Sequence, residues 1–225
     1  LLSARAGRLA AALLLALPCL LSAGLVQALP IDVVVDHNAD YLTLVNATAT
    51  ASAGICQVTM GGSPATRCSS SPSDCSLRAA LLCANAYANS SQDVRIIFAD
   101  FGEQREIALV AFLPELRADD LVIDGFACVD CDWFPTSGDL EDALGSPGPE
   151  AESYAEYYIS QFVPGPTING ENFSGGLAAD ALLRVTGDNV RIRGLHLVRG
   201  PAAAIEFQAR TGGGAPQGGA VTGCF

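Results

Sequence analysis

The sequence contains no lysine and only two histidines, so it is poor in the side chains that most often act as catalytic bases or metal ligands. All twelve basic residues are arginine, against 24 acidic residues, and the formal net charge is −12. A surface with this excess of negative charge repels polyanions, which argues against nucleic acid as a partner. No resident cofactor is predicted, but an acidic polysaccharide would need a bridging cation such as calcium.

Long apolar runs are also absent, except near the N-terminus. There Arg5 and Arg8 precede an uncharged stretch over residues 9–26, which is followed by small residues up to Ala28. This order of basic, apolar and small residues predicts a secretory signal peptide over residues 1–28. The stretch is also about as long as a short membrane span, so membrane contact is expected only if it stays uncleaved or an anchor lies downstream. We therefore predict a secreted or cell-surface protein.

The two ends of the chain lack the features of a complete protein. It opens with Leu1 rather than methionine, and it stops at Cys224 and Phe225, directly after a glycine-rich stretch. We therefore expect a piece of a longer protein. The residues after the predicted signal peptide are enough to bury one sizeable core.

Cysteine content agrees with export. Seven of the eight cysteines follow the predicted signal peptide, and exported proteins usually join such residues in disulfides. Cys128 and Cys131 also have the spacing of a metal-binding pair, but one such pair with two histidines is weak support for zinc. We predict disulfides and no metal site, with Cys224 left over. The predicted disulfide cysteines are Cys56, Cys68, Cys75, Cys83, Cys128 and Cys131.

Three sequons predict N-glycosylation if the host is a eukaryote. They lie at Asn46, Asn89 and Asn172, in a chain with only seven asparagines. Because glycosylated asparagines must be accessible, these three positions are expected at the surface.

The region before residue 75 reads as an N-terminal segment of strand and loop, over residues 29–74. Residues 31–35 and 41–45 are apolar runs rich in strand formers. Residues 61–74 are mostly glycine, serine, proline and threonine, which predicts a loop.

A single short helix is predicted over residues 76–88. Leu77 and Leu81 lie on one apolar stripe, and Asp74 or Ser76 can cap the first turn. Beyond this helix, apolar segments alternate with turns at residues 94–98, 107–113, 121–124, 190–193 and 204–207.

The spacing of the later segments predicts stacked coils. Ile123 and Ile168 are 45 residues apart, and Ile168 and Ile192 are 24 apart. One coil of a β-helix takes roughly 20–30 residues. We therefore predict parallel, stacked strands at 94–98, 121–124, 190–193 and 204–207, with Ile96, Ile123, Ile192 and Leu195 buried. Glycine, asparagine and aspartate are expected at the corners.

Residues 135–166 interrupt this pattern. Six acidic residues and five prolines lie there without any basic residue. We predict a long acidic loop leaving one coil, either as a solvated insertion or as a binding loop that calcium could bridge to an acidic glycan.

The stretch Cys75-Ser76-Leu77-Arg78-Ala79-Ala80-Leu81, followed by Ala84-Asn85-Ala86, resembles the CSLREA-type motif that opens many exported β-helix proteins. Ala79 departs from it, since the motif usually has glutamate there. The resemblance implies an all-β fold of the pectin-lyase-like superfamily. It would be the N-terminal part of a right-handed parallel β-helix, or solenoid, over residues 75–225, with a short amphipathic helix capping the first coil.

The order of helix, strands and Ile-Asp-Gly turn also looks like the front of pectate lyases. No residue of this chain matches a catalytic position of that family, whose catalytic residues come from later coils. The resemblance therefore implies one of two functions. A non-enzymatic surface protein in adhesion or glycan contact is favoured, and the alternative is a polysaccharide lyase or glycoside hydrolase whose active site lies beyond this fragment.

Three arginines are the candidate contacts for a carboxylate-bearing glycan: Arg191, Arg193 and Arg199, which cluster in sequence around His196. A solvated strand face is the alternative for all three. His196 is expected to point outward without a partner, and Asp124 to serve its turn through backbone contacts.

Overall fold

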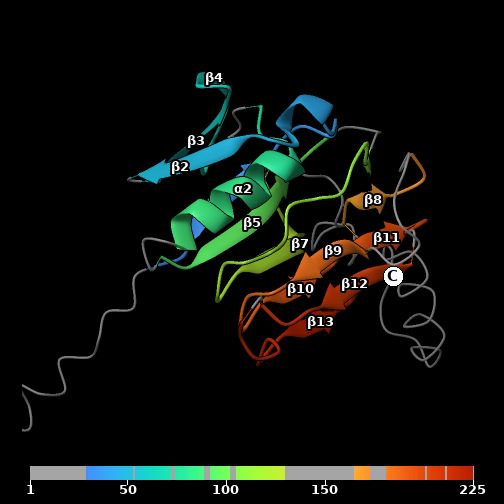
Figure 1. Cartoon of the computed structure of the whole chain (residues 1–225). Helices are drawn as coiled ribbons and strands as arrows, with labels where there is room; N and C mark the ends of the chain where they lie inside the picture. The colour runs from blue at the N-terminus through green and yellow to red at the C-terminus, as the bar shows by residue number, and fades with distance from the viewer. Residues whose placement is uncertain are drawn as a thin grey trace, which may run out of the picture.

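The computed structural model describes residues 29–52, 54–71, 74–88, 92–101, 105–129, 165–172, 181–200, 202–210 and 212–224. The predicted signal peptide and nearly all of the predicted acidic loop lie outside these residues. Within them the chain is mostly β-strand, with one α-helix, α2 (Leu77–Ala88), and one short 3-10 helix, η1 (Leu42–Leu44) (Figure 1). The predicted all-β composition with a single short helix is confirmed for the described part.

The longest sheet joins five parallel strands drawn from across the chain. Its order is β1 (Ile31–Val35), β5 (Val94–Ala99), β7 (Val122–Val129), β10 (Arg191–Arg193) and β13 (Ala220–Thr222). Ile96 lies beside Ile123, which lies beside Ile192. All three side chains are buried, as is Leu195 just after β10. The predicted parallel stacking of β5, β7 and β10 and the burial of these four residues are confirmed.

Two further sheets are also parallel. One contains β6 (Glu106–Ala108), β8 (Thr167–Asn169) and β11 (His196–Val198), and the other contains β9 (Ala181–Val185) and β12 (Ala203–Phe207). Single parallel bridges extend them, from Ala39 to Ala108 and from Leu116 to Val185. The chain passes through the three sheets in turn, from β7 to β8 to β9 and again from β10 to β11 to β12.

Two details of the predicted stacking are wrong. The strand at 204–207 pairs with β9 and not with the strand at 190–193. Ile168 pairs with Ile107 and Leu197 in the second sheet, so its spacing to Ile192 is not the length of a coil. Residues that are truly stacked are 27 apart for Ile96 and Ile123 and 29 apart for Ile168 and Leu197. Because consecutive short strands enter different sheets, similar apolar segments fill different positions of the repeat.

The N-terminal segment also differs from its prediction in two places. Residues 41–45, predicted as a strand, contain η1. Residues 61–74, predicted as a loop, contain β4 (Ser63–Cys68), the edge of an antiparallel sheet with β3 (Ile55–Met60) and β2 (Thr48–Ser52). The polar composition of β4 hid the strand, which is joined to its surroundings by cysteine rather than by apolar side chains.

Two disulfides join the antiparallel sheet to the helix region. Cys56 and Cys68 are neighbours across β3 and β4, and they bond to Cys83 in α2 and to Cys75 just before it. The prediction that these four cysteines form disulfides is confirmed. Both crosslinks are buried, so they close loops of the unfolded chain without presenting sulfur to solvent.

Helix α2 lies between the antiparallel sheet and the strands β1 and β5, as Figure 1 shows. Ser76 caps it, since its hydroxyl oxygen accepts the N–H of Ala79 at 3.3 Å. The prediction of one apolar stripe is wrong, because the helix is covered on more than one side. Its buried residues are Leu77, Arg78, Ala79, Ala80, Leu81, Cys83, Ala84 and Tyr87. One continuous core joins α2 to the antiparallel sheet and to all three parallel sheets.

Replacement of Leu81 by aspartate tests the burial of this helix. Leu81 is 1 % exposed, so a charge there should lower the free energy of unfolding by about 3 kcal/mol, measured by denaturant titration. Ile55→Asp is the matched control, because Ile55 lies on an exposed part of β3. Coincident unfolding curves for the two variants would show that Leu81 makes no core contact.

Candidate functional site

Arg78, from the motif at the start of α2, forms a buried ion pair with Asp40. Its Nε and Nη2 atoms donate to the two carboxylate oxygens of Asp40, each at 2.6 Å, and its side chain is 1 % exposed. It also donates to the carbonyls of Ala111 at 2.7 Å and Phe112 at 2.5 Å. The N–H of Val110 donates to Asp40 at 3.0 Å. Both charges are therefore well supplied with hydrogen bonds, which a buried pair needs to be stable.

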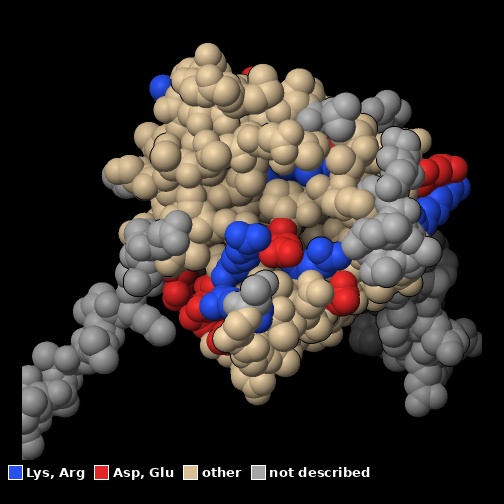
Figure 2. Space-filling model, viewed as in Figure 1, with Lys and Arg blue, Asp and Glu red and all other residues tan. Residues whose placement is uncertain are grey.

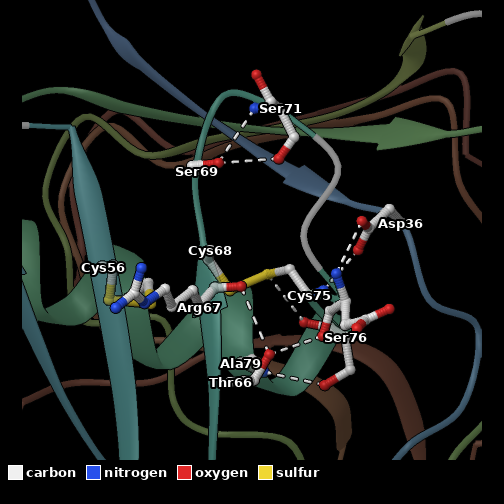
Figure 3. Close-up of a disulfide and its surroundings, with 12 residues drawn as sticks. Asp36, Cys56, Thr66, Arg67, Cys68, Ser69, Ser71, Cys75, Ser76 and Ala79 are labelled. Atoms are coloured by element: carbon white, nitrogen blue, oxygen red, sulfur yellow. Dashed lines mark hydrogen bonds between the residues drawn. A yellow bond between two sulfur atoms is a disulfide. The ribbon is translucent and has the colours of Figure 1, made fainter. Parts of the chain in front are cut away.

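The residues just before Arg78 hold the start of the helix in place. Figure 3 shows the Cys68–Cys75 disulfide beside the carboxylate of Asp36, which accepts the N–H of Cys75 at 2.5 Å. The same view shows Ser76 beside Ala79, the capping bond of the first turn. These motif residues thus have structural partners.

Asn85 extends the same junction to the segment over residues 115–118. Its amide nitrogen donates to the carbonyl of Glu115 at 2.7 Å, and its amide oxygen accepts the N–H groups of Arg117 at 2.8 Å and Ala118 at 3.3 Å. One side chain thereby satisfies three backbone groups of an irregular segment. The motif from Cys75 to Asn85 explains how the helix is attached, and its contacts are those of an anchor rather than of a catalytic site.

The outward face of the five-stranded sheet carries most of the predicted glycan contacts. Arg193 of β10 pairs with Asp124 of β7 at 2.5 Å, and Arg95 of β5 pairs with Asp32 of β1 at 2.8 Å. The hydrogen bond to Asp124 raises the pKa of Arg193, and the bond to Asp32 raises the pKa of Arg95. The side chain of Arg191 is exposed and makes no hydrogen bond or ion pair within the described part of the chain, although the backbone N–H of Arg191 donates to the carbonyl of Leu121.

The third predicted arginine lies elsewhere. Arg199 follows β11 in the second sheet and pairs with Glu171, where both side chains are exposed. The expected cluster is therefore divided, because a corner at Gly194 separates β10 from β11. His196 is not without a partner, since its Nδ1 atom lies 3.2 Å from the hydroxyl of Thr167.

Asp124 makes the predicted contact with the nearby backbone and also forms an ion pair. One carboxylate oxygen accepts the N–H of Phe126 at 3.2 Å, and the other binds Arg193. The next residue is Gly125, and a Cβ atom at this position would lie 2.1 Å from the carbonyl oxygen of Gly194. The close approach of β7 to the backbone at Gly194 therefore requires glycine at this position.

A polar corner that the sequence analysis did not predict precedes three strands of the five-stranded sheet, β7, β10 and β13. Asp119 accepts the N–H of Asp188, and Asp188 accepts the N–H of Gln217, each at 2.8 Å. The next residue in each copy has positive φ: 57° at Asp120, 56° at Asn189 and 68° at Gly218. In the sequence, the residue with positive φ lies five positions before a glycine in each copy. The last copy has few apolar residues, so the repeat is hard to recognise from the sequence.

The remaining predicted positions divide between described and undescribed residues. Asn46 and Asn172 are exposed, and Asn89 lies outside the described residues. Cys128 is disulfide-bonded, Cys131 lies outside the described residues, and Cys224 is a free thiol whose pKa is raised by burial.

No group of three or more His, Cys, Asp or Glu side chains in the described ranges is placed to hold a metal ion. None of the described helices is long and apolar enough to cross a membrane.

No family model matches the chain, and the comparisons with curated proteins and with solved structures found no significant match.

The Arg78–Asp40 pair can be tested by removing one partner. Arg78→Met should lower the free energy of unfolding by about 3–5 kcal/mol, because it leaves Asp40 buried without its counter-charge. Asp40→Leu combined with Arg78→Met should recover part of this loss in the same denaturant titration. Arg199→Gln is the control, since an exposed pair contributes little. Equal effects of Arg78→Met and Arg199→Gln would contradict the anchoring role.

Proposed function

We propose that this chain forms the first coils of a right-handed parallel β-helix, which works outside the cytoplasm and binds glycan without cleaving it. The parallel pairing of all three later sheets supports the fold, as do the 27- and 29-residue spacings between stacked residues. Parallel crossover connections are right-handed in nearly all proteins. Helix α2 and the antiparallel sheet would cover the end of the first coil, where unpaired strand edges need protection.

The extracellular location rests on the disulfides and on the predicted signal peptide. Cys56–Cys83 and Cys68–Cys75 are buried and join the antiparallel sheet to the helix region. Such bonds persist in oxidising compartments and are rare in the cytosol.

The exposed side chain of Arg191 is the observation that supports binding of a glycan. This side chain is exposed, makes no hydrogen bond or ion pair within the described residues, and lies on the same face of β10 as that of Arg193, which is 48 % exposed. Neighbouring strands of a sheet are about 4.8 Å apart, so this face offers evenly spaced contacts to an extended polymer. A guanidinium group binds a sugar carboxylate through paired N–H donors.

Binding without cleavage is supported by the state of the nearest carboxylate. A lyase acting on an acidic sugar needs a base that can reach the substrate proton. Asp124 is 2 % exposed and paired with Arg193, and the arginines themselves stay protonated, which makes them poor bases.

The experiment measures binding and turnover of polygalacturonate together. The protein should bind the polymer, and Arg191→Gln should weaken binding by about tenfold, because a charge-assisted hydrogen bond contributes roughly 1.5 kcal/mol or more. Binding is followed by calorimetry with and without calcium, and unsaturated product by ultraviolet absorbance. Arg199→Gln is the control, since Arg199 lies beyond a different sheet. Calcium-dependent turnover that is lost in Arg193→Gln would show an enzyme instead, and unchanged binding by Arg191→Gln would exclude this face.

A further inference from the structure

A charged hollow of about 640 Å³ lies over the third parallel sheet, away from the face that carries Arg191. It forms where the segment around Leu116 lies parallel to the end of β9, which in turn pairs with the end of β12. We call it the arginine groove, and the lining residues used below are Glu115, Arg117, Arg184, Thr186, Gln208 and Arg210. Figure 2 shows arginine and acidic side chains gathered on this side, over the region of β9 and β12 in Figure 1.

The registers explain why these side chains meet. Leu116 pairs with Val185, and Val185 pairs with Phe207. The residues one step earlier are Glu115, Arg184 and Glu206, so a row of alternating charge crosses three strands. One step later the chain has Arg117, Thr186 and Gln208, which form a second row with one positive charge and no negative charge. Side chains two apart on a strand share a face, so both rows border the groove, although Thr186 itself is buried.

The groove concentrates arginine within an acidic protein, and each of its arginines contacts a carboxylate, of Glu115, Glu206 or Asp119. Three arginines and one glutamate line it, although the chain has a net charge of −12. Arg210 is fixed as part of its wall, because it donates to the carbonyls of Thr186 and Arg117, each at 2.8 Å, and to Asp119. Arg117 is 69 % exposed and contacts the carboxylate of Glu115 at 2.9 Å. The positive groups are therefore held in place and remain open to solvent.

Glu115 occupies the place that a bound anion would take. Its carboxylate lies between two guanidinium groups, 2.9 Å from Arg117 and 3.8 Å from Arg184. The contact to Arg184 is long, and Arg184 also lies 3.5 Å from Glu206. The side-chain amide of Gln208 makes no hydrogen bond within the described part of the chain, which leaves a neutral donor in the same groove.

We propose that the arginine groove binds the oxyanion of an acidic glycan, a carboxylate or a sulfate, by displacing the carboxylate of Glu115. Guanidinium groups match both oxyanions through paired N–H donors. Glu115 acts as an internal competitor, so a single oxyanion binds weakly and a polymer binds more tightly through repeated contacts. This site is independent of the face that carries Arg191, and either can fail without the other.

Two variants should change affinity in opposite directions. Glu115→Gln removes the competing charge and keeps the side-chain shape, so it should tighten binding by about threefold to tenfold. Arg117→Gln removes the most exposed guanidinium and should weaken binding by about tenfold. Polygalacturonate, dextran sulfate and inorganic sulfate are the probes, in calorimetry at low ionic strength, where screening is weak. A preference between the first two probes identifies a carboxylate or a sulfate as the ligand group.

Glu171→Gln and Arg199→Gln form the matched control, because they neutralise an exposed ion pair at another sheet. Neither should shift affinity in the manner of the groove variants, and circular dichroism confirms that each variant folds. If Glu115→Gln does not fold, Arg117→Lys keeps the charge, loses the paired donors and should still weaken binding. Unchanged or weaker binding by Glu115→Gln would overturn the proposal. The ion pairs of the groove would then have only a structural role between neighbouring segments. Loss of binding in Arg191→Gln alone would likewise assign all glycan contact to the other face.

Discussion

The buried pair of Arg78 and Asp40 is the contact on which the start of the fold depends. Arg78 belongs to α2, whereas Asp40 follows the first parallel strand, and the same guanidinium holds the carbonyls of Ala111 and Phe112. Removing two charges from water is costly, so such a pair is stable only when its other hydrogen bonds are made. Here they are made by the backbone of a later segment. The helix, the segment after β1 and the segment around Ala111 are thereby held at one point.

Parallel stacking constrains the charges as strongly as it constrains the core. Each paired residue lies beside its counterpart in the neighbouring strand, so equal charges side by side would repel each other. Two such neighbours in the five-stranded sheet have opposite charges, Asp32 with Arg95 and Asp124 with Arg193. The side chain of Arg191 departs from this rule within the described residues. Arg117 lies beside neutral side chains of the neighbouring strands, and its carboxylate partner, Glu115, comes from its own segment.

The motif that suggested the family of folds is informative about architecture. Cys75 forms a disulfide and Ser76 caps the helix. Arg78 binds a buried carboxylate, and Asn85 binds the backbone of a later segment. None of these partners is a substrate or a metal ion. Contacts of this kind attach the helix to the sheets and specify no activity, since function resides in sites added to the fold.

Local patterns were sufficient for part of this structure. Apolar alternation predicted the strands around Ile96, Ile123 and Ile192, and the helical stripe with its serine cap predicted α2, because these signals arise within a few residues. The sheet that each strand joins, the strand β4 with its polar sequence, and the groove of Arg117 and Arg184 were decided only by tertiary structure. Those features depend on which residues of distant segments lie side by side, and the varying length of chain between paired strands removes that information from the sequence spacing.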